Sequence, residues 1–354
     1  MAESQNENSV MFALEHYQLA LELFIQHLAT PAVESWIIFP SLWLFILYEQ
    51  TYGDDPKILQ AHLRGVRDVI ATHGTKVLSW SIDERKISEQ ESGENYIPSQ
   101  MINKMAVWTI HYDAKASTFG LDGGIIDLLN QKFPGSMQRL CESSKHALKN
   151  AWGPAYPAFE EVWDMQVDDL WMLNHETTML RFELSILERK RGKIVSSEKI
   201  NFGKKLRIIE KRFSNYASIA LSKQRERSDL VSNICSLVAD LYALIVRYDR
   251  ITYHIQSSAL SPLLKVCAYL YEYEGSSFLW HIAWPLFVAS FETDDPIHQS
   301  WIIDRFEQME KTGKNMRRAK IMLKELFKTK RDMSQPVDYY LDWIVDSKFE
   351  QFSI

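Results

Sequence analysis

The sequence predicts an all-α protein: a single large domain of packed helical hairpins, with no sheet. Glycine and proline number only 13 and 11 among 354 residues, whereas sheets joined by many tight turns need more of both. No alternation of apolar and polar residues persists over five positions, and apolar residues instead recur at helical spacing. With 46% hydrophobic and 24% charged residues, the composition is globular, and a chain of this length can bury a large core.

Three helices are predicted in the N-terminal part. Apolar residues at spacings of three and four form a stripe on a helix over 10–28, with Ser9 as its cap: Leu14, Tyr17, Leu21, Phe24 and Leu28. The next stretch, up to Gly53, is apolar all round, which is typical of a central helix that Pro40 kinks or divides. A third helix begins at the capping pair Asp55-Pro56 and ends at Gly74. Its apolar stripe is Leu59, Leu63, Val66 and Ile70.

The rest of the chain also reads as helices joined by short breaks. Polar residues 83–95 predict a surface loop, the glycines of STFGLDGG (117–124) a break, and AWGPAYP (151–157) a rigid turn. Helices are expected from Pro98 to about Tyr112, from near Ser136, and over 159–190, 197–221, 228–256, 261–273, 294–308, 315–327 and near 338–346. For the domain organisation, we expect a disordered N-terminus over 1–9 and one helical domain over 10–354, with a candidate internal break near 151–158.

Charge is unevenly distributed along an acidic chain. The net charge is -6, so nucleic-acid binding would need a local basic patch. Residues 189–227 contain thirteen Lys or Arg and three Asp or Glu. Residues 311–331 contain nine Lys or Arg and one Glu. Such stretches suit phosphate, an acidic partner or a nuclear import signal, for which RKRGK at Arg189–Lys193 is a candidate. The alternative is that both are solvated helix faces.

The cysteines and the N-terminal residues indicate in which cellular compartment the protein is expected. The three cysteines, Cys141, Cys235 and Cys267, are far apart in the sequence and predict small buried side chains in a reducing compartment. The first residues, MAESQNENSV, are polar and acidic, unlike a signal or transit peptide. No apolar run reaches the roughly 18 residues that span a bilayer, so no membrane segment is expected.

The sequence assigns no residue to a catalytic, cofactor-binding or metal-ligating role, and no cofactor is expected. HExxH, short Cys or His pairs, GxSxG, a P-loop and GxGxxG are all absent from it. Asp168-Asp169 has a superficial likeness to an aspartate-rich magnesium motif, but the third carboxylate that such a clamp needs is missing. Asp294-Asp295 precedes Pro296, a pattern typical of a helix cap.

FLWHIAWPLFVASF, residues 278–291, is a stretch of fourteen residues with almost no charge. It is too short to cross a membrane, so burial in the core is expected. His281 lies in its middle, and two interpretations stay open. One is a core histidine that bonds to a backbone carbonyl, and the other is a histidine that lines a pocket.

Several segments together resemble the fungal-specific transcription factor domain, the helical region that follows the binuclear zinc cluster in many fungal regulators. They are EHYQLALELFIQHL, LYEQTYG, HLRGVRDVIATHG, VWTIHYDAKASTFGL and, most specifically, LWHIAWPLFVASFETDDPIHQSWIIDRFEQMEKTGKNMRRAKIMLKELF. Trp284, Pro285, Leu286, Asp294, Asp295, Trp301 and Ile302 fit the pattern of that last segment. The likeness extends loosely from about Val10 to the end.

The resemblance implies a regulatory protein of the nucleus, but the family's zinc cluster cannot be carried over. That cluster needs six cysteines, and this sequence has none before Cys141. We therefore expect a free-standing member that binds a protein partner or a small effector, without autonomous sequence-specific DNA binding. Regulators of this type occur in fungal secondary-metabolite clusters. A gene in which an upstream zinc-cluster exon has been lost or omitted is a further alternative.

The alternative from another class is that the same helical domain serves as a tailoring enzyme or a binder of a polyketide or terpenoid metabolite. An aromatic-rich interior can hold an apolar metabolite. Trp280, His281, Trp284 and Asp168 are then the first residues to test.

Overall fold

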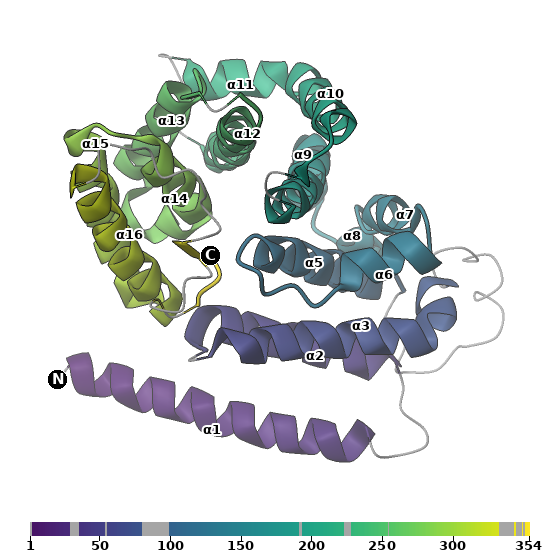
Figure 1. Ribbon diagram of the computed structural model, residues 1–354. Helices are drawn as coiled ribbons and strands as arrows, with labels where there is room; N and C mark the ends of the chain where they lie inside the picture. Colours follow the sequence, from purple (N-terminus) through teal and green to yellow (C-terminus); the bar gives the residue numbers. More distant parts are fainter. Residues whose placement is uncertain are drawn as a thin grey trace.

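A computed structural model describes residues 2–28, 35–53, 55–79, 99–190, 193–222, 228–253, 255–332, 343–344, 349 and 351–354. Across these ranges the chain forms helices and turns and no strand, which confirms the all-α fold. Figure 1 shows the helices arranged around the C-terminus, which lies near the middle of the view. The predicted loop at 83–95 and most of the predicted helix near 338–346 lie outside the described residues.

The N-terminal array consists of α1 (Ala2–Leu28), α2 (Ser35–Tyr52) and α3 (Pro56–Ser79). The predicted cap of α3 is confirmed, because the Asp55 carboxylate accepts the backbone N–H of Lys57 at 2.9 Å. The predicted end at Gly74 is wrong, since one glycine costs a helix interior only about 1 kcal/mol and helix-compatible residues follow it. Four residues of the α3 stripe are at most 3% exposed: Leu59, Leu63, Val66 and Ile70.

Helix α2 runs through Pro40 without dividing. A proline removes one helical hydrogen bond. Burial of Ile38, Phe39 and Leu42, each at most 5% exposed, offsets that loss. The helix is not buried all round as predicted, since Leu44 is 55% exposed.

Helix α1 lies beside α2 and α3 along the edge of the array (Figure 1). Tyr17 stacks on Tyr48 with ring centroids 4.2 Å apart, and Phe24 contacts Phe45 edge-on at 5.5 Å. Only part of the predicted stripe is covered, because Leu14 and Leu28 are exposed. The helix begins at Ala2, ahead of the predicted cap Ser9. The division of the chain into a disordered N-terminus and one domain stays a prediction.

The middle of the chain is a cluster of shorter elements. They are α5 (Ser99–Ser117), α6 (Ile125–Lys132), α7 (Ser136–Ser143), α8 (Ala147–Trp152) and the 3-10 helix η1 (Gly153–Ala155). The sequence did not predict α6 and α8, which have 8 and 6 residues. Helices this short have little propensity of their own and depend on tertiary packing.

The C-terminal half surrounds a buried central helix, α12 (Asp229–Tyr253). Its neighbours are α9 (Ala158–Arg189), α10 (Ser196–Arg212), α11 (Ser214–Leu221), α13 (Leu260–Glu274), the 3-10 helix η3 (Gly275–Ile282) and α14 (Ala283–Glu292). The remaining elements, α15 (Pro296–Met309), η4 (Glu310–Thr312) and α16 (Lys314–Asp332), pack against one another, and α15 and α16 also pack against α14. The predicted helix over 197–221 divides at Phe213, whose ring is only 3% exposed.

Helix α12 is long and apolar enough, by length and composition alone, to cross a membrane. It passes that test although the sequence shows no long uninterrupted apolar run. More than half of its most apolar window, 56%, is buried against other helices of the protein. That burial is typical of the core helix of a globular domain.

Candidate functional site

The apolar stretch 278–291 forms the end of η3 and nearly all of α14. Every residue of α14 is buried, and Leu286, Phe287, Val288 and Ala289 have no exposed surface. The prediction that this stretch lies in the core is confirmed for α14. It fails for Trp280, which is 58% exposed. In this 3-10 helix the buried residues Leu279 and Ile282 are three positions apart and therefore share one face, so the Trp280 indole lies on another face.

His281 is half-buried between two aromatic rings. Its ring centroid lies 4.1 Å from that of Phe278 and 3.5 Å from that of Trp280. Burial, followed by the positive charge of Lys115, lowers the pKa of His281 to about 4. The predicted bond from the ring to a carbonyl is not found among the described residues. The His281 carbonyl itself accepts the Ser236 hydroxyl at 3.4 Å.

Of the other residues proposed for a metabolite site, Trp280 contacts His281, but Trp284 and Asp168 lie elsewhere. Trp284 is 4% exposed and lies in the core, on α14. Asp168 lies on α9, where its carboxylate pairs with Lys145 at 2.9 Å. No contact between Asp168 and His281 occurs within the part of the chain that the structure describes. The four residues therefore form no shared reaction centre there.

Arg181 connects the Trp284 region to the C-terminus. Its guanidinium carbon lies 4.1 Å from the centre of the Trp284 ring, a cation–π geometry. Its Nε donates to the Thr118 hydroxyl at 2.8 Å, and its Nη2 donates to the backbone oxygen of Ile354 at 2.9 Å. Phe352 has no exposed surface. The C-terminal residues thus lie inside the helical array, as Figure 1 shows.

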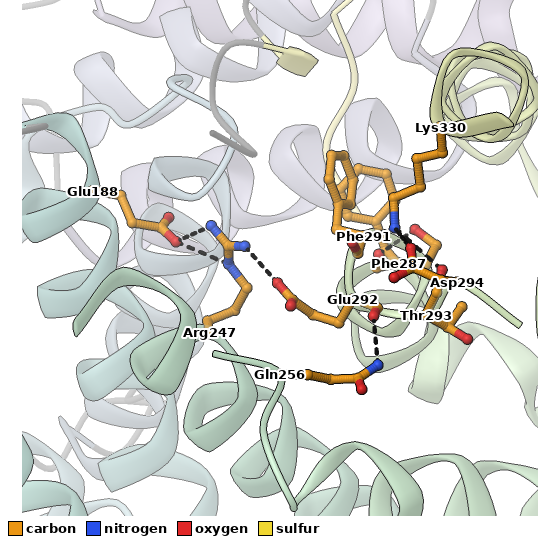
Figure 2. A network of polar contacts seen from close by, with 10 residues as sticks. Glu188, Arg247, Gln256, Phe287, Phe291, Glu292, Thr293, Asp294 and Lys330 are labelled. Carbon is orange, nitrogen blue, oxygen red and sulfur yellow. Dashed lines mark hydrogen bonds and ion pairs between the residues drawn. The ribbon is translucent and has the colours of Figure 1, made fainter. Parts of the chain in front are cut away.

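A buried ion network joins α9, α12 and α14 (Figure 2). Arg247 of α12 donates from Nε and Nη2 to Oε1 of Glu188, at 2.9 and 2.5 Å, and its Nη1 lies 3.3 Å from Glu292. These three side chains are 3–6% exposed. Burial raises the pKa of Glu292, and Arg247 lowers it in part. The sequence signal was a charged residue within the apolar run ALIVRYDRI, which the sequence analysis missed.

The same network continues to α16 through the backbone after α14. The Lys330 ammonium donates to the carbonyls of Phe291 and Thr293 at 2.6 and 3.2 Å and pairs with Asp294 at 3.2 Å (Figure 2). The Asp295 carboxylate accepts the N–H of Ile297 at 2.8 Å, which confirms its predicted role as a helix cap. The two aspartates therefore hold helix ends together, as structural groups.

Two histidines that are 64 residues apart in the sequence meet in the core. His111 of α5 and His175 of α9 share a hydrogen bond of 3.0 Å between Nε2 and Nδ1. Burial lowers the pKa of His175 to about 4, and burial followed by the charges of His175 and Lys115 holds the pKa of His111 well below its usual value. No group of three His, Cys, Asp or Glu side chains that could hold a metal ion occurs among the described residues.

Lys115 of α5 and Asp240 of α12 form a second group of interior charges. Burial lowers the pKa of Lys115 and raises that of Asp240 to about 6, and each charge partly offsets the shift of the other. Each side chain still has accessible surface. Neither has an ion pair or side-chain hydrogen bond within the described ranges.

The basic stretch 189–227 runs from the end of α9 through α10 and α11, and the stretch 311–331 covers the end of η4 and most of α16. In 189–227, the described bases include Arg189, paired with Asp122 at 3.5 Å, and Lys205, paired with Glu183 at 2.7 Å. Residues 191–192 of the candidate import signal lie outside the described residues. On α16, by contrast, a line of basic side chains faces the solvent.

Fold and site together define an all-helical protein held by interior ion networks, with charged helix faces outside. The family model of the fungal specific transcription factor domain matches residues 178–350. This part of the chain belongs to that family, and the domain indicates a role in transcription regulation. The match begins inside α9 and includes Arg181, Arg247 and α16. Searches of curated proteins and of solved structures found no match.

Proposed function

We propose that this protein is a nuclear regulator of transcription that acts by binding a protein partner. The observation that carries the proposal is the family match over residues 178–350. The sequence has three cysteines, all of them buried, whereas a binuclear zinc cluster needs six, so these three do not supply one. Control of a secondary-metabolite gene cluster is the target that we propose, by likeness to free-standing regulators of this kind.

Binding to DNA by the purified chain tests the dependence on a partner. In a gel shift with promoter DNA from the gene's own locus, we expect only weak binding that fades by about 200 mM salt, since contacts with phosphate depend on released counterions. A duplex of the same length and shuffled sequence is the control. Tight binding to the promoter alone at that salt would contradict the proposal.

A deletion strain separates regulation from catalysis. We expect loss of transcripts from the target cluster when the gene is deleted. Loss of one metabolite step with unchanged transcripts would instead support the alternative of a tailoring enzyme or metabolite binder. A fusion of the chain to a heterologous DNA-binding module should restore a reporter's response if partner recruitment is its role.

A small-molecule effector is the second candidate, and the interior pair of Lys115 and Asp240 favours it. Both groups are partly buried, yet neither has an ion-pair partner among the described side chains, so a polar ligand would supply interactions that the fold does not. Thermal unfolding with a panel of small acids, amines and zwitterions tests this. A stabilising compound should lose its effect in Lys115→Met and in Asp240→Asn, and retention of the effect in both would exclude the site.

A further inference from the structure

Helix α16 has a buried face and an opposite face made almost entirely of basic side chains. Ala319, Met322, Leu323 and Leu326 of the inner face have no exposed surface. The exposed positions follow one another at spacings of three and four, so they form a straight line on the helix. This line, the α16 basic stripe, consists of Lys314, Arg317, Ile321, Lys324, Lys328 and Arg331.

The stripe is distinct from the bases that hold the fold together. Lys320 turns toward Glu307 and Glu310, and Lys330 toward the end of α14. Arg317 makes only a peripheral pair with Glu310 at 3.5 Å and is 67% exposed. Lys324 and Lys328 have no ion pair within the part of the chain that the structure describes. Lys324 and Lys328, in the C-terminal half of the stripe, thus carry charge that no ion pair among the described residues neutralises.

The length and spacing of the stripe fit another helix. From Lys314 to Arg331 it extends about 26 Å at the helical rise of 1.5 Å per residue. A partner helix with Asp or Glu at spacings of three and four would present one carboxylate to each base in turn. Long-range attraction would also speed the encounter, because opposite charges steer association.

One residue of the stripe favours a protein over nucleic acid. Ile321, in the middle of the line, is 52% exposed. Phosphate backbones offer no apolar surface to cover it, whereas an amphipathic helix can place a leucine or phenylalanine there. The net charge of -6 also opposes docking of a long polyanion such as duplex DNA.

We propose that the α16 basic stripe is the docking surface for an acidic amphipathic helix of a partner protein, centred on Ile321. This inference rests on the proposed function as a partner-dependent regulator and names the surface that the partner uses. The binding itself can be measured on the purified chain, so its failure is distinguishable from a failure of the regulatory role.

A labelled 20-residue peptide provides the test. It carries Asp and Glu at spacings of three and four around one leucine, and binding is followed by fluorescence anisotropy at about 150 mM salt. A scrambled peptide of the same composition and a 25-bp duplex are the comparison ligands. We expect the patterned peptide to bind at least about fivefold more tightly than either, because only it matches the spacing of the bases.

The variants localise the site. The double variant Lys324→Glu/Lys328→Glu should lower the affinity for the patterned peptide about tenfold or more. The control Lys204→Glu/Lys211→Glu makes an equal charge change on the exposed face of α10 and should change that affinity less than about twofold. Ile321→Ser should lower the affinity for the patterned peptide about threefold and leave the affinity for the duplex unchanged. Circular dichroism and urea unfolding confirm that each variant folds.

Several outcomes would overturn the proposal. If both double variants lost the same affinity for the patterned peptide, only the net charge of the protein would matter. If the α16 double variant bound the peptide as tightly as the wild type, the stripe would be a solvated helix face and no docking surface. Tighter binding of the duplex, insensitive to Ile321→Ser, would identify a phosphate-binding surface. A dimer in light scattering that Lys324→Glu/Lys328→Glu abolishes would identify a second copy as the occupant.

Discussion

The Arg247 guanidinium donates two hydrogen bonds to one carboxylate oxygen of Glu188, at 2.9 and 2.5 Å, inside the helical core. Both side chains are at most 6% exposed, and Glu292 lies 3.3 Å away on the other side. Glu188 has Arg247 as its ion-pair partner, whereas the charges of Arg250 and Lys330 also act on Glu292. We expect Arg247→Met to destabilise the fold by about 3–5 kcal/mol, because the Glu188 carboxylate would stay buried without its ion-pair partner.

Urea unfolding measures this change, with Arg317→Met as the matched control. Arg317 is 67% exposed and its ion pair is peripheral, so its loss should cost about 0.5 kcal/mol or less. Adding Glu188→Gln and Glu292→Gln to Arg247→Met should recover part of the loss, since the stranded charges are then removed. An Arg247→Met protein as stable as the control would show that water reaches the two carboxylates.

Arg181 should hold the C-terminal residues in place. Its guanidinium bonds the Ile354 carbonyl at 2.9 Å while lying 4.1 Å from the Trp284 ring centre. Arg181→Gln is expected to cost about 2–3 kcal/mol, through the lost charge-assisted bond and cation–π contact. Amide hydrogen exchange at residues 351–354 should become faster by more than the loss of global stability alone would produce.

The comparison variant for Arg181 is Gln50→Ala. The Gln50 amide also holds the C-terminal residues, by one neutral hydrogen bond of 3.0 Å to the Ser353 carbonyl. Its loss should cost only about 1 kcal/mol. If both variants accelerated exchange at 351–354 equally, Arg181 would have no special role there.

Periodicity in the sequence was enough to predict the helices but not their polar contacts. The stripe of α3 and the burial of α14 follow from apolar spacing, which is a local signal. The Arg247 network, by contrast, joins residues 45 and 59 positions apart in the sequence. No spacing rule connects such positions, because only the packing of α9, α12 and α14 brings them together. Likewise, the apolar stretch around His281 predicted burial, and the residue is half-buried. That its ring has no carbonyl partner among the described residues could not be predicted.

The His111–His175 pair should make stability depend on pH. Burial lowers the pKa of His175 to about 4 in the folded state, against about 6.5 in an unfolded chain. The folded state therefore favours the neutral ring, and its stabilisation is complete above about pH 6.5 and is lost as the pH falls toward 4. A shift of this size corresponds to about 3 kcal/mol across that window.

Urea unfolding at pH 7.5 and at steps down to pH 4 measures the effect. His175→Gln keeps a side chain that can bond to His111 but cannot gain a proton at low pH. Its stability should therefore fall less steeply than that of the wild type over this window, although it starts lower at pH 7.5. Parallel pH profiles would contradict the assignment and place the acid sensitivity on other groups.

Two glycines should respond to alanine in opposite directions. A Cβ on Gly123 would lie 2.4 Å from the Leu63 Cβ and 2.5 Å from the Leu63 carbonyl carbon, so α3 would have to move. The N–H of Gly123 also bonds to the buried Asp113 carboxylate, which accepts those of Ile125 and Ile126 at 2.9 and 3.1 Å and so fixes the start of α6. We expect Gly123→Ala to destabilise the fold by about 2 kcal/mol or more, by forcing apart two packed helices.

Gly65 is the matched control, since it lies within α3 near the same contact. Its added Cβ would meet only the Leu42 Cδ2 at 3.7 Å, an ordinary van der Waals distance. Alanine is the better helix former by about 0.5–1 kcal/mol, so Gly65→Ala should raise the urea midpoint while Gly123→Ala lowers it. If Gly123→Ala were neutral, the α3–α6 contact would be looser than described, and the N-terminal array could shift relative to α5 without cost.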